Sequence, residues 1–336
     1  MSTNDASVKN SLYEESEPFL KAHPDYDVST LPRWVTENIE VARVYGNSKK
    51  GIILPDGRKY HLNNHLNDLT GKEWTFFINS VFATHYPTNG KESYAHSIRK
   101  IHPTPKPPQL MRDLIYFFTK EGELVFDTFM GVGGTLLGAA LADRKAAGIE
   151  LNQTYIDAYH EAAKELELMD FTTACGDSLT ILQDEKTMAE LTGGEEISLL
   201  LFDPPYGNMM SKEKTGADIQ VYGKTATPFS TSDADLGNMD RQQFLEKLKE
   251  SVELSLPYIK YRGYVVMFIK DLQPSKKQTN LLHAEVIDAL NQIPNLYYKG
   301  MKIWADESTK LYPYGYPFSF VANQIHQYIL VFRKER

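Results

Sequence analysis

The sequence has one cysteine in 336 residues, and this scarcity excludes a disulfide framework and any cluster of thiolate ligands. Histidine does not supply metal ligands in place of cysteine, because the nine histidines are scattered without metal-ligand spacing. His160-Glu161 resembles the start of a zinc-protease helix, but position 164, where a second histidine is required, is Lys. The sequence therefore predicts no metal site.

Long hydrophobic runs are also missing, since no segment approaches the roughly 18 apolar residues of a membrane span. The amino terminus, MSTNDASVKNSLYEE, is polar and contains no apolar signal segment. Hydrophobic residues still make up 42% of the chain, which is enough for a sizeable core in one large domain or two ordinary ones. We therefore expect a globular, cytoplasmic protein with no membrane partner.

An excess of positive charge is absent as well. Lys and Arg number 36 against 44 Asp and Glu, so the formal net charge is −8. This balance argues against a protein that coats nucleic acid without specificity, but it permits an enzyme with a local basic groove. Candidates for such a groove recur at Arg99, Lys100, Lys106 and Arg112.

The hydrophobic pattern divides the chain at about residue 100. Residues 1–100 show no clear periodicity and predict an irregular accessory or DNA-contacting module. From residue 101 to 336, short apolar segments alternate with amphipathic helical ones, which predicts an α/β domain with a parallel sheet. The segments 296–304 and 327–333 lack a helix between them, which favours an antiparallel pair at one sheet edge. Within this domain, the stretch 207–240 is rich in Gly, Ser, Thr, Asp and Asn and predicts a mobile functional loop.

Acidic residues and glycines follow the predicted strands where ligands bind in open α/β sheets. The strand at 124–126 leads into Asp127 and a turn with Gly131 and Gly133, where missing side chains allow the backbone to approach a ligand. Position 136 is Leu, so the pattern departs from the dinucleotide fingerprint. The sequence therefore favours another kind of cofactor.

Carboxylates also end the next two predicted strands. Glu150 stands 17 residues after Gly133, where it could accept hydrogen bonds from two ribose hydroxyls. Asp177 follows Gly176, where it could accept from an adenine amino group, although an Asp at this place also favours a helix cap.

The apolar run at 199–202 ends in Asp203-Pro204-Pro205-Tyr206. An exocyclic amine on a base is a poor nucleophile, so an enzyme must hold it in line and relieve its protons as charge develops. The carboxylate of Asp203 and the carbonyl of Pro204 can accept from such an amine, and Pro205 keeps the backbone rigid. The ring of Tyr206 offers a surface on which an extruded base can stack.

With these motifs the sequence resembles the S-adenosylmethionine-dependent amino methyltransferases of DNA, over roughly residues 100–336. The resemblance lies in five segments that follow one another in this order: HPTPKPPQLMRDLIYFFT, LVFDTFMGVGGTLLGAAL, AAGIELN, ACGDSL and LLLFDPPYG. It implies a Rossmann-like methyltransferase fold with a seven-stranded, mostly parallel sheet and an antiparallel final strand. It also implies S-adenosyl-L-methionine as the cofactor, held by Asp127, Phe129, Gly131, Gly133, Glu150, Asp177 and Asp203.

The resemblance implies that the partner is DNA and that Asp203, Pro204, Pro205 and Tyr206 catalyse transfer to N6 of a flipped-out adenine, since relatives acting on cytosine N4 more often carry Ser at the first position. An N4-cytosine enzyme, an RNA amino methyltransferase and a noncatalytic binding subunit remain the alternatives. A cognate restriction or defence partner is also allowed. Cytosine C5 methylation is disfavoured, because it needs a thiolate nucleophile and Cys175 is expected to be a small core residue. One departure is Gly134, where many relatives carry Thr or Ser.

Overall fold

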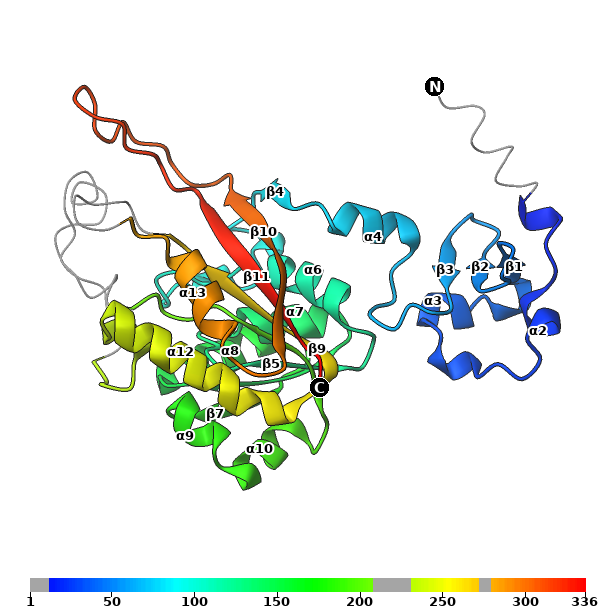
Figure 1. Cartoon of the computed structure of the whole chain (residues 1–336), viewed down its shortest axis with the longest axis horizontal. Helices are drawn as coiled ribbons and strands as arrows, with labels where there is room; N and C mark the ends of the chain where they lie inside the picture. The colour runs from blue at the N-terminus through cyan, green and yellow to red at the C-terminus, as the bar shows by residue number, and fades with distance from the viewer. Residues whose placement is uncertain (1–11, 208–230, 272–278) are drawn as a thin grey trace. The chain divides into compact units, whose positions relative to one another are not determined.

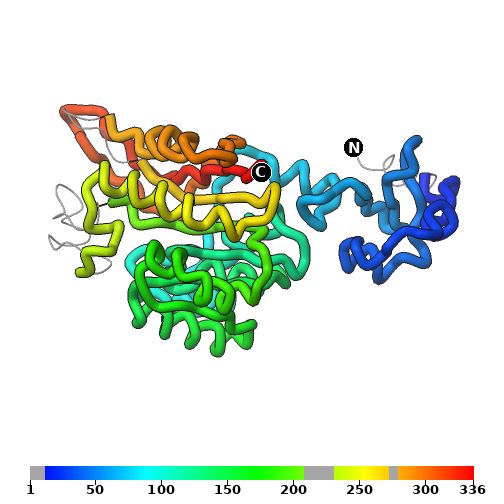
Figure 2. The backbone as a smooth tube through the Cα atoms, turned by 60° about the horizontal axis from the view of Figure 1, so that its bottom comes forward, coloured from blue at the N-terminus to red at the C-terminus, as the bar shows by residue number. Residues whose placement is uncertain are grey.

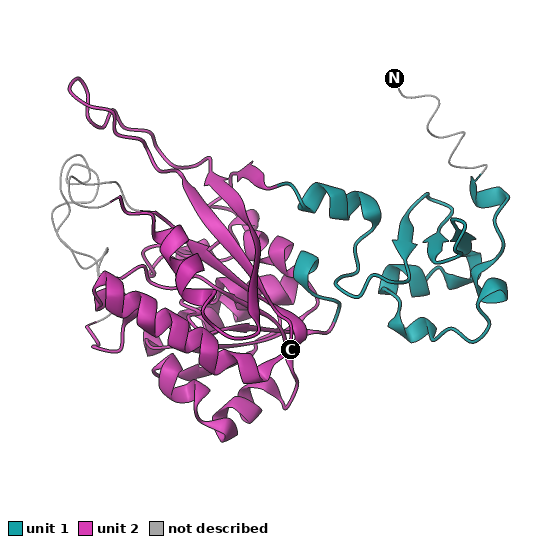
Figure 3. Cartoon of the chain, in the orientation of Figure 1, with its two compact units in different colours: residues 1–79, 116–121 teal, residues 80–115, 122–336 magenta. Residues whose placement is uncertain are grey.

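The computed structural model of the chain describes residues 12–207, 231–271 and 279–336. They form two compact units, one of residues 1–79 and 116–121 and the other of residues 80–115 and 122–336 (Figure 3). The central part of the predicted loop, residues 208–230, lies outside the described residues. No helix in the described ranges is long and apolar enough to cross a membrane.

The first unit is a small module with an antiparallel sheet and its own core. The sheet has the order β1 (Arg43–Tyr45), β2 (Gly51–Ile53), β3 (Lys59–His61). Phe19, Val35 and Ile52 are fully buried in its core cluster. The helices of this unit are α2 (Phe19–Ala22), η1 (Val28–Thr30), α3 (Arg33–Thr36), η2 (Ile39–Val41) and α4 (Gly71–Phe77).

The second unit is built on one mostly parallel sheet of eight strands. Its order is β4 (Val81–Thr84), β10 (Leu296–Asp306), β11 (His326–Lys334), β9 (Ile259–Ile269), β8 (Ile197–Phe202), β5 (Leu124–Asp127), β6 (Lys145–Glu150), β7 (Thr172–Cys175). β11 runs antiparallel to both of its neighbours, β9 and β10, which confirms the Rossmann-like methyltransferase arrangement with an antiparallel final strand. The eighth strand, β4, was not predicted: it pairs in parallel with β10 and extends the sheet beyond the seven expected strands.

Helices cover both faces of this sheet, as expected for parallel strands joined by crossovers. Figures 1 and 2 show α12 and α13 on one side of the sheet, and Figure 1 shows α6 and α7 behind it. Side-chain caps fix several helix starts: Asn152 accepts from Thr154 N, and Asp240 forms a capping box with Gln243. The helices are η3 (Lys91–Ser93), α5 (His96–Arg99), α6 (Pro108–Phe118), α7 (Gly134–Leu141), α8 (Gln153–Glu165), α9 (Ser178–Leu182), α10 (Glu185–Thr192), η4 (Leu236–Asn238), α12 (Arg241–Ser255), η5 (Leu256–Tyr258) and α13 (Leu282–Leu290).

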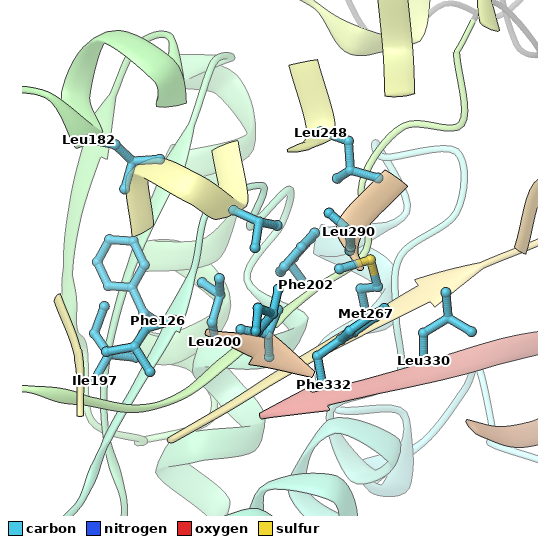
Figure 4. Close-up of a cluster of buried hydrophobic side chains, with 14 of the residues drawn as sticks. Phe126, Leu182, Ile197, Leu200, Phe202, Leu248, Met267, Leu290, Leu330 and Phe332 are labelled. Carbon is cyan, nitrogen blue, oxygen red and sulfur yellow. The ribbon is translucent and has the colours of Figure 1, made fainter. Parts of the chain in front are cut away.

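Strand β8 is the centre of the core and carries the functional motif at its end. All six of its residues are buried, and Leu200 and Phe202 join the cluster under α12 and α13 (Figure 4). Leu199 and Leu201 alternate with them and are also fully buried. Burying a side chain of this size stabilises the fold by about 1.5–3 kcal/mol. The side chains on both faces of β8 are therefore buried, and Asp203 is the first residue after the strand ends.

The predicted loop 207–240 ends earlier than expected. Asp235 accepts a hydrogen bond from Gly237 N at 2.7 Å and begins η4. Leu236 is only 3% exposed and packs in the same core cluster as Phe202. The last residues of this polar stretch are therefore part of the packed domain, because one leucine anchors them.

Candidate active site

A cavity of about 270 Å³ lies at the carboxyl ends of the parallel strands. It collects the residues that follow β5, β6, β7 and β8, as the topology requires. Eight of the sequence-predicted site residues line it: Phe129, Gly131, Glu150, Asp177, Asp203, Pro204, Pro205 and Tyr206. The remaining two predicted residues, Asp127 and Gly133, are not among the residues that line this cavity.

Asp127 holds the glycine-rich turn by two hydrogen bonds. Its carboxylate accepts from Phe129 N at 2.9 Å and from Thr135 Oγ1 at 2.5 Å. The side chain is buried, and this burial raises the pKa of the carboxyl to about 7. Asp127 lines a smaller cavity of about 30 Å³, together with Gly131 and Asp203. The structure thus gives Asp127 a bracing contact at the turn.

The two glycines of this turn differ in what they permit. Both have left-handed φ angles, +51° at Gly131 and +74° at Gly133. A Cβ at Gly133 would lie 2.1 Å from Cδ2 of Tyr159, so this glycine allows α8 to pack against the turn. Gly131 instead faces the cavity, where its lack of a side chain keeps the backbone open to a ligand.

Glu150 is held rigidly at the end of β6. One carboxylate oxygen accepts from Gly131 N at 2.8 Å and the other from Asn152 N at 2.9 Å. Burial raises the pKa of Glu150, although these backbone hydrogen bonds oppose the shift. Each carboxylate oxygen has a second lone pair, so the group can still accept from two neighbouring hydroxyls of a ligand.

Asp177 has two contacts at once. It begins α9 by accepting from Leu179 N at 3.2 Å, and it also accepts from Thr180 Oγ1 at 2.9 Å. It is therefore a helix cap, the plainer of the two possibilities that its sequence position allowed. It lines the cavity as well, next to Ser178.

Asp203 is engaged by two side chains. Its Oδ2 lies 2.5 Å from the Nζ of Lys106, and its Oδ1 accepts a hydrogen bond from the hydroxyl of Tyr206. Burial raises the pKa of the Tyr206 hydroxyl well above its ordinary value, and the neighbouring Asp203 charge adds to the shift. Tyr206 therefore contributes a neutral donor in addition to its ring.

Lys106 was not among the predicted site residues, yet it is buried in the site with a side chain only 9% exposed. Its ammonium also lies 5.0 Å from the ring centre of Phe268. Behind it, the fully buried Arg99 donates two hydrogen bonds to the carbonyl of Lys106, at 3.0 and 3.1 Å. Lys106 and Arg99, two residues of the expected basic groove, are therefore buried and hold Asp203 in position.

His102 is a second residue that the sequence prediction missed. It lines the cavity, and its ring meets that of Tyr155 edge-on at 4.9 Å. Its Nδ1 accepts from Thr104 N at 3.2 Å. Burial, with the nearby charges of Lys106 and Arg99, lowers the pKa of His102 to about 4, so the ring is neutral near pH 7. The signal for both missed residues was the HPTPK segment itself, which supported the resemblance but was given no site role.

A second cavity, also of about 270 Å³, adjoins the first at Lys106. Thr104, Lys270 and Gln327 line both cavities, and the carbonyl oxygen of the Gln327 side chain is buried without a partner among the described residues. Tyr86 and Trp304 supply aromatic surface to the second cavity, with ring centres 6.4 Å apart. Lys106 thus separates the two spaces.

Comparison with known proteins agrees with this geometry. Residues 8–162 match a family described as DNA methylase, and this match includes the glycine-rich turn and Glu150. The chain is 38% identical over 78 residues to the orphan methyltransferase M.BamHII of Bacillus amyloliquefaciens, covering 23% of this chain and 29% of the relative. Over these residues the chain is similar to the DNA methylase family.

Two further relatives extend the comparison. The type II methyltransferase M1.MboII of Moraxella bovis is 30% identical over 144 residues, which is 43% of this chain and 50% of the relative. A tRNA (guanine(10)-N2)-dimethyltransferase of Methanocaldococcus jannaschii is 28% identical over 142 residues, or 42% and 40% of the two chains. The chain thus spans half or less of the length of these relatives.

The match to the DNA methylase family supports S-adenosyl-L-methionine as the cofactor, and the residues of the cavity that contains Glu150 and Asp203 fit it. Glu150 offers a braced, paired acceptor for ribose hydroxyls, and Gly131 lines the cavity beside it without a side chain. Phe129, Tyr155 and Leu236 add apolar surface for a purine, with Asp177 as a polar neighbour.

The departure at Gly134 also has a physical reason in this structure. A Cβ at this position would lie 2.8 Å from the carbonyl oxygen of Lys106 and 3.2 Å from its Cβ. The glycine therefore allows the segment that contains Lys106 to pass directly over the start of α7. A hydroxyl-bearing residue here would push against the backbone that places Lys106 beside Asp203.

Cys175 corrects one expectation from the sequence. It is exposed and free instead of being buried in the core, because β7 is the last strand of the sheet. Its pKa is raised, first by partial desolvation and then by the charge of Glu150. A thiol with a raised pKa is a weak nucleophile.

Proposed function

We propose that this chain transfers a methyl group from S-adenosyl-L-methionine to the exocyclic N6 of adenine in DNA, on a base extruded from the duplex. One observation carries the proposal: the carboxylate of Asp203 stands in a cavity that also contains Glu150 and Gly131. The carboxylate acceptor and the residues proposed to hold the cofactor thus line one cavity. Similarity to the DNA methylase family and to type II and orphan DNA methyltransferases supports the reaction class.

The chemistry assigned to Asp203 follows from the weakness of an aromatic amine as a nucleophile. When bound, S-adenosyl-L-methionine supplies an electrophilic methyl group on a positively charged sulfur. The amine must be oriented, and it must lose one proton as its nitrogen forms the new bond. Asp203 is placed to accept a hydrogen bond from the amine, and the hydroxyl of Tyr206 and the ammonium of Lys106 hold the carboxylate in position.

The choice of adenine rests on Asp at position 203, as in the sequence interpretation. N4 of cytosine is the nearest alternative, because it is also an exocyclic amine and needs the same acceptor. An RNA amine is the second alternative, and the tRNA dimethyltransferase relative supports it. A cognate restriction or defence enzyme is the partner class that the proposed function implies, since methylated target sites would be protected from cleavage.

A methyl-transfer assay with labelled cofactor against DNA, RNA and no acceptor tests this proposal. We expect label in DNA, and N6-methyladenine when the DNA is digested and analysed by mass spectrometry. N4-methylcytosine as the main product would overturn the base assignment, and label in RNA alone would overturn the substrate class.

Two variants tie the activity to the site. Asp203→Asn should abolish transfer without unfolding the protein. The matched control is Glu123→Gln, which also removes a carboxylate paired with a lysine, Lys260, but outside the cavity. It should keep wild-type activity. Transfer by the Asp203→Asn protein at the wild-type rate would remove Asp203 from the mechanism. A wild type that transfers no label to any acceptor would leave a noncatalytic role for the fold.

A further inference from the structure

The connection between β10 and β11 displays aromatic rings to solvent. We call residues 307–325 the aromatic arm; it joins the two strands after their last ladder pair, Ala305 with His326. Figure 1 shows it projecting beyond the ends of β10 and β11. Phe318 and Phe320 are each 93% exposed, more than any other large hydrophobic side chain in the described part of the chain. The arm carries five aromatic residues: Tyr312, Tyr314, Tyr316, Phe318 and Phe320.

Hydrogen bonds hold the backbone of the arm. The side-chain amide of Asn323 accepts from Tyr312 N and donates to Tyr312 O, both at 2.8 Å. At the tip, Phe318 N and Ser319 N both donate to Gly315 O, at 2.7 and 2.8 Å. Gly315 has a φ of +75°, and a Cβ there would lie 2.3 Å from Ser319 O. The exposed rings are therefore presented by a built turn.

Tyr316, Phe318 and Phe320 are exposed within five residues of sequence. Several exposed rings in one short segment indicate a binding surface, because each leaves a large apolar area in water. The charge of the arm narrows the class of partner. Within residues 307–325 the only charged side chains are Glu307 and Lys310, so the arm has little with which to bind phosphates or a charged protein face. Aromatic rings without charge suit the flat faces of nucleic-acid bases, since every base can stack on them.

The two ends of the aromatic arm, next to β10 and β11, line the second cavity beside the site. Asp306, Ser308, Thr309 and Ile325 line the second cavity, which Lys106 also lines. Lys106 is paired with Asp203. A nucleic acid that places one base beside Asp203 therefore brings neighbouring nucleotides toward this arm.

We infer that the aromatic arm is a stacking surface for bases next to the target nucleotide. This inference rests on the proposed function, and it deepens it by assigning substrate contact to a segment that no motif identified. Stacking on the arm would help to keep the target base out of the duplex. The rings of the arm would either stack on an unpaired neighbouring base or enter the gap that the target base leaves.

The test compares Phe318→Ala/Phe320→Ala with Phe76→Ala, a matched control that removes a phenylalanine 82% exposed on α4 of the first unit. Binding to duplex DNA, single-stranded DNA and RNA oligonucleotides is measured by fluorescence anisotropy, with cofactor binding followed by calorimetry. We expect the double variant to lose about 10- to 100-fold in affinity for the preferred oligonucleotide, as loss of base stacking does. Phe318→Tyr/Phe320→Tyr should restore binding, and cofactor affinity should not change.

A structural role and a phosphate-binding role predict different results. Because the rings neutralise no phosphate, the slope of log affinity against log salt should be the same in the double variant and the wild type. Unchanged oligonucleotide affinity in the double variant would overturn the inference, and so would a change confined to self-association in sedimentation, which would assign the arm to a protein partner. If the wild type methylates DNA and the double variant binds oligonucleotides equally well, the inference about the arm is rejected and the proposed function stands. If binding depends on the arm but the wild type methylates nothing, the proposed function is rejected and the inference about the arm stands. Failure of the wild type to bind any of the three oligonucleotides would reject both.

Discussion

The ammonium of Lys106 lies 2.5 Å from Oδ2 of Asp203, and the two residues are 97 positions apart in the sequence. Their side chains are only 9% and 17% exposed, so little water is available to replace either partner. Removing one charge from such a pair leaves the other poorly solvated. The position of the proposed catalytic carboxylate therefore depends on a segment that precedes all of the predicted cofactor-binding residues.

A double-mutant cycle of Lys106→Met and Asp203→Asn should measure this dependence. We expect a coupling free energy of about 1–3 kcal/mol in urea unfolding, because the pair is largely desolvated. The control pair is Lys145 and Glu195, which is equally close at 2.6 Å but 55% and 47% exposed. Its coupling should be below about 1 kcal/mol. Equal coupling in the two pairs would show that burial does not strengthen the Lys106 contact.

Glu150→Gln should weaken S-adenosyl-L-methionine binding by about 1–3 kcal/mol, because charge-assisted hydrogen bonds to the ribose would be lost. The exposed Glu195→Gln serves as the control and should bind cofactor as the wild type does. Calorimetry gives the affinities. Glu150 also accepts from Gly131 N and Asn152 N, so unfolding curves must be recorded in parallel. Unchanged affinity in a folded Glu150→Gln protein would remove this residue from the cofactor site.

Asp127 should make stability depend on pH. Its ordinary pKa is 3.8, and burial raises the pKa to about 7 in the folded protein. Between these values the folded state holds a proton that the unfolded chain has released. The free energy of unfolding should therefore fall as pH rises, by up to about 1.4 kcal/mol per pH unit, until about pH 7.

Asp127→Asn removes this titration and should reduce the slope between pH 5 and pH 7 in urea unfolding. The control is Asp184→Asn, because Asp184 is an exposed cap whose pKa is lowered by hydrogen bonds from Thr187. The stability that Asp184 adds is present above its unfolded pKa, so its loss should leave the wild-type slope unchanged. An identical slope in wild type and Asp127→Asn would contradict the prediction.

Gly134→Ser introduces the residue type that many relatives carry. Since a Cβ at Gly134 would meet Lys106 at 2.8 and 3.2 Å, we expect a loss of about 1–3 kcal/mol in the free energy of unfolding. Gly71→Ser is the control, because a Cβ at Gly71 meets no atom within 4 Å. Methyl transfer should fall with Gly134→Ser, since the shifted backbone carries Lys106. A serine that raises both stability and activity would show that the segment moves freely.

Several features of the fold followed from local sequence because their causes are short-range. The apolar run at β8 and its stop at two prolines predicted a buried strand with Asp203 at its end, and both are observed. The segments 296–304 and 327–333 were predicted to pair antiparallel, as β10 and β11 do. Periodicity, breakers and turn residues act within a few positions, so they can be read without the fold.

Edge strand β4 and the exposure of Cys175 needed the tertiary structure, because a strand of four residues and a lone thiol have no local signal of their neighbours. The position of Asp177 in the lining of the cavity also needed the tertiary structure. Its position predicted either a helix cap or a ligand contact, and only the fold shows one carboxylate that caps α9 and also lines the cavity.

The sequence by itself therefore determined the alternation of strands and helices after residue 100, the identity of the motifs and the edge of the sheet where they meet. The tertiary structure decided which groups touch there. It brought Lys106 to Asp203, set Arg99 behind Lys106 and placed the base of the aromatic arm on the wall of the second cavity. These contacts join residues far apart along the chain, and their energies depend on burial and distance, which exist only once the chain has folded.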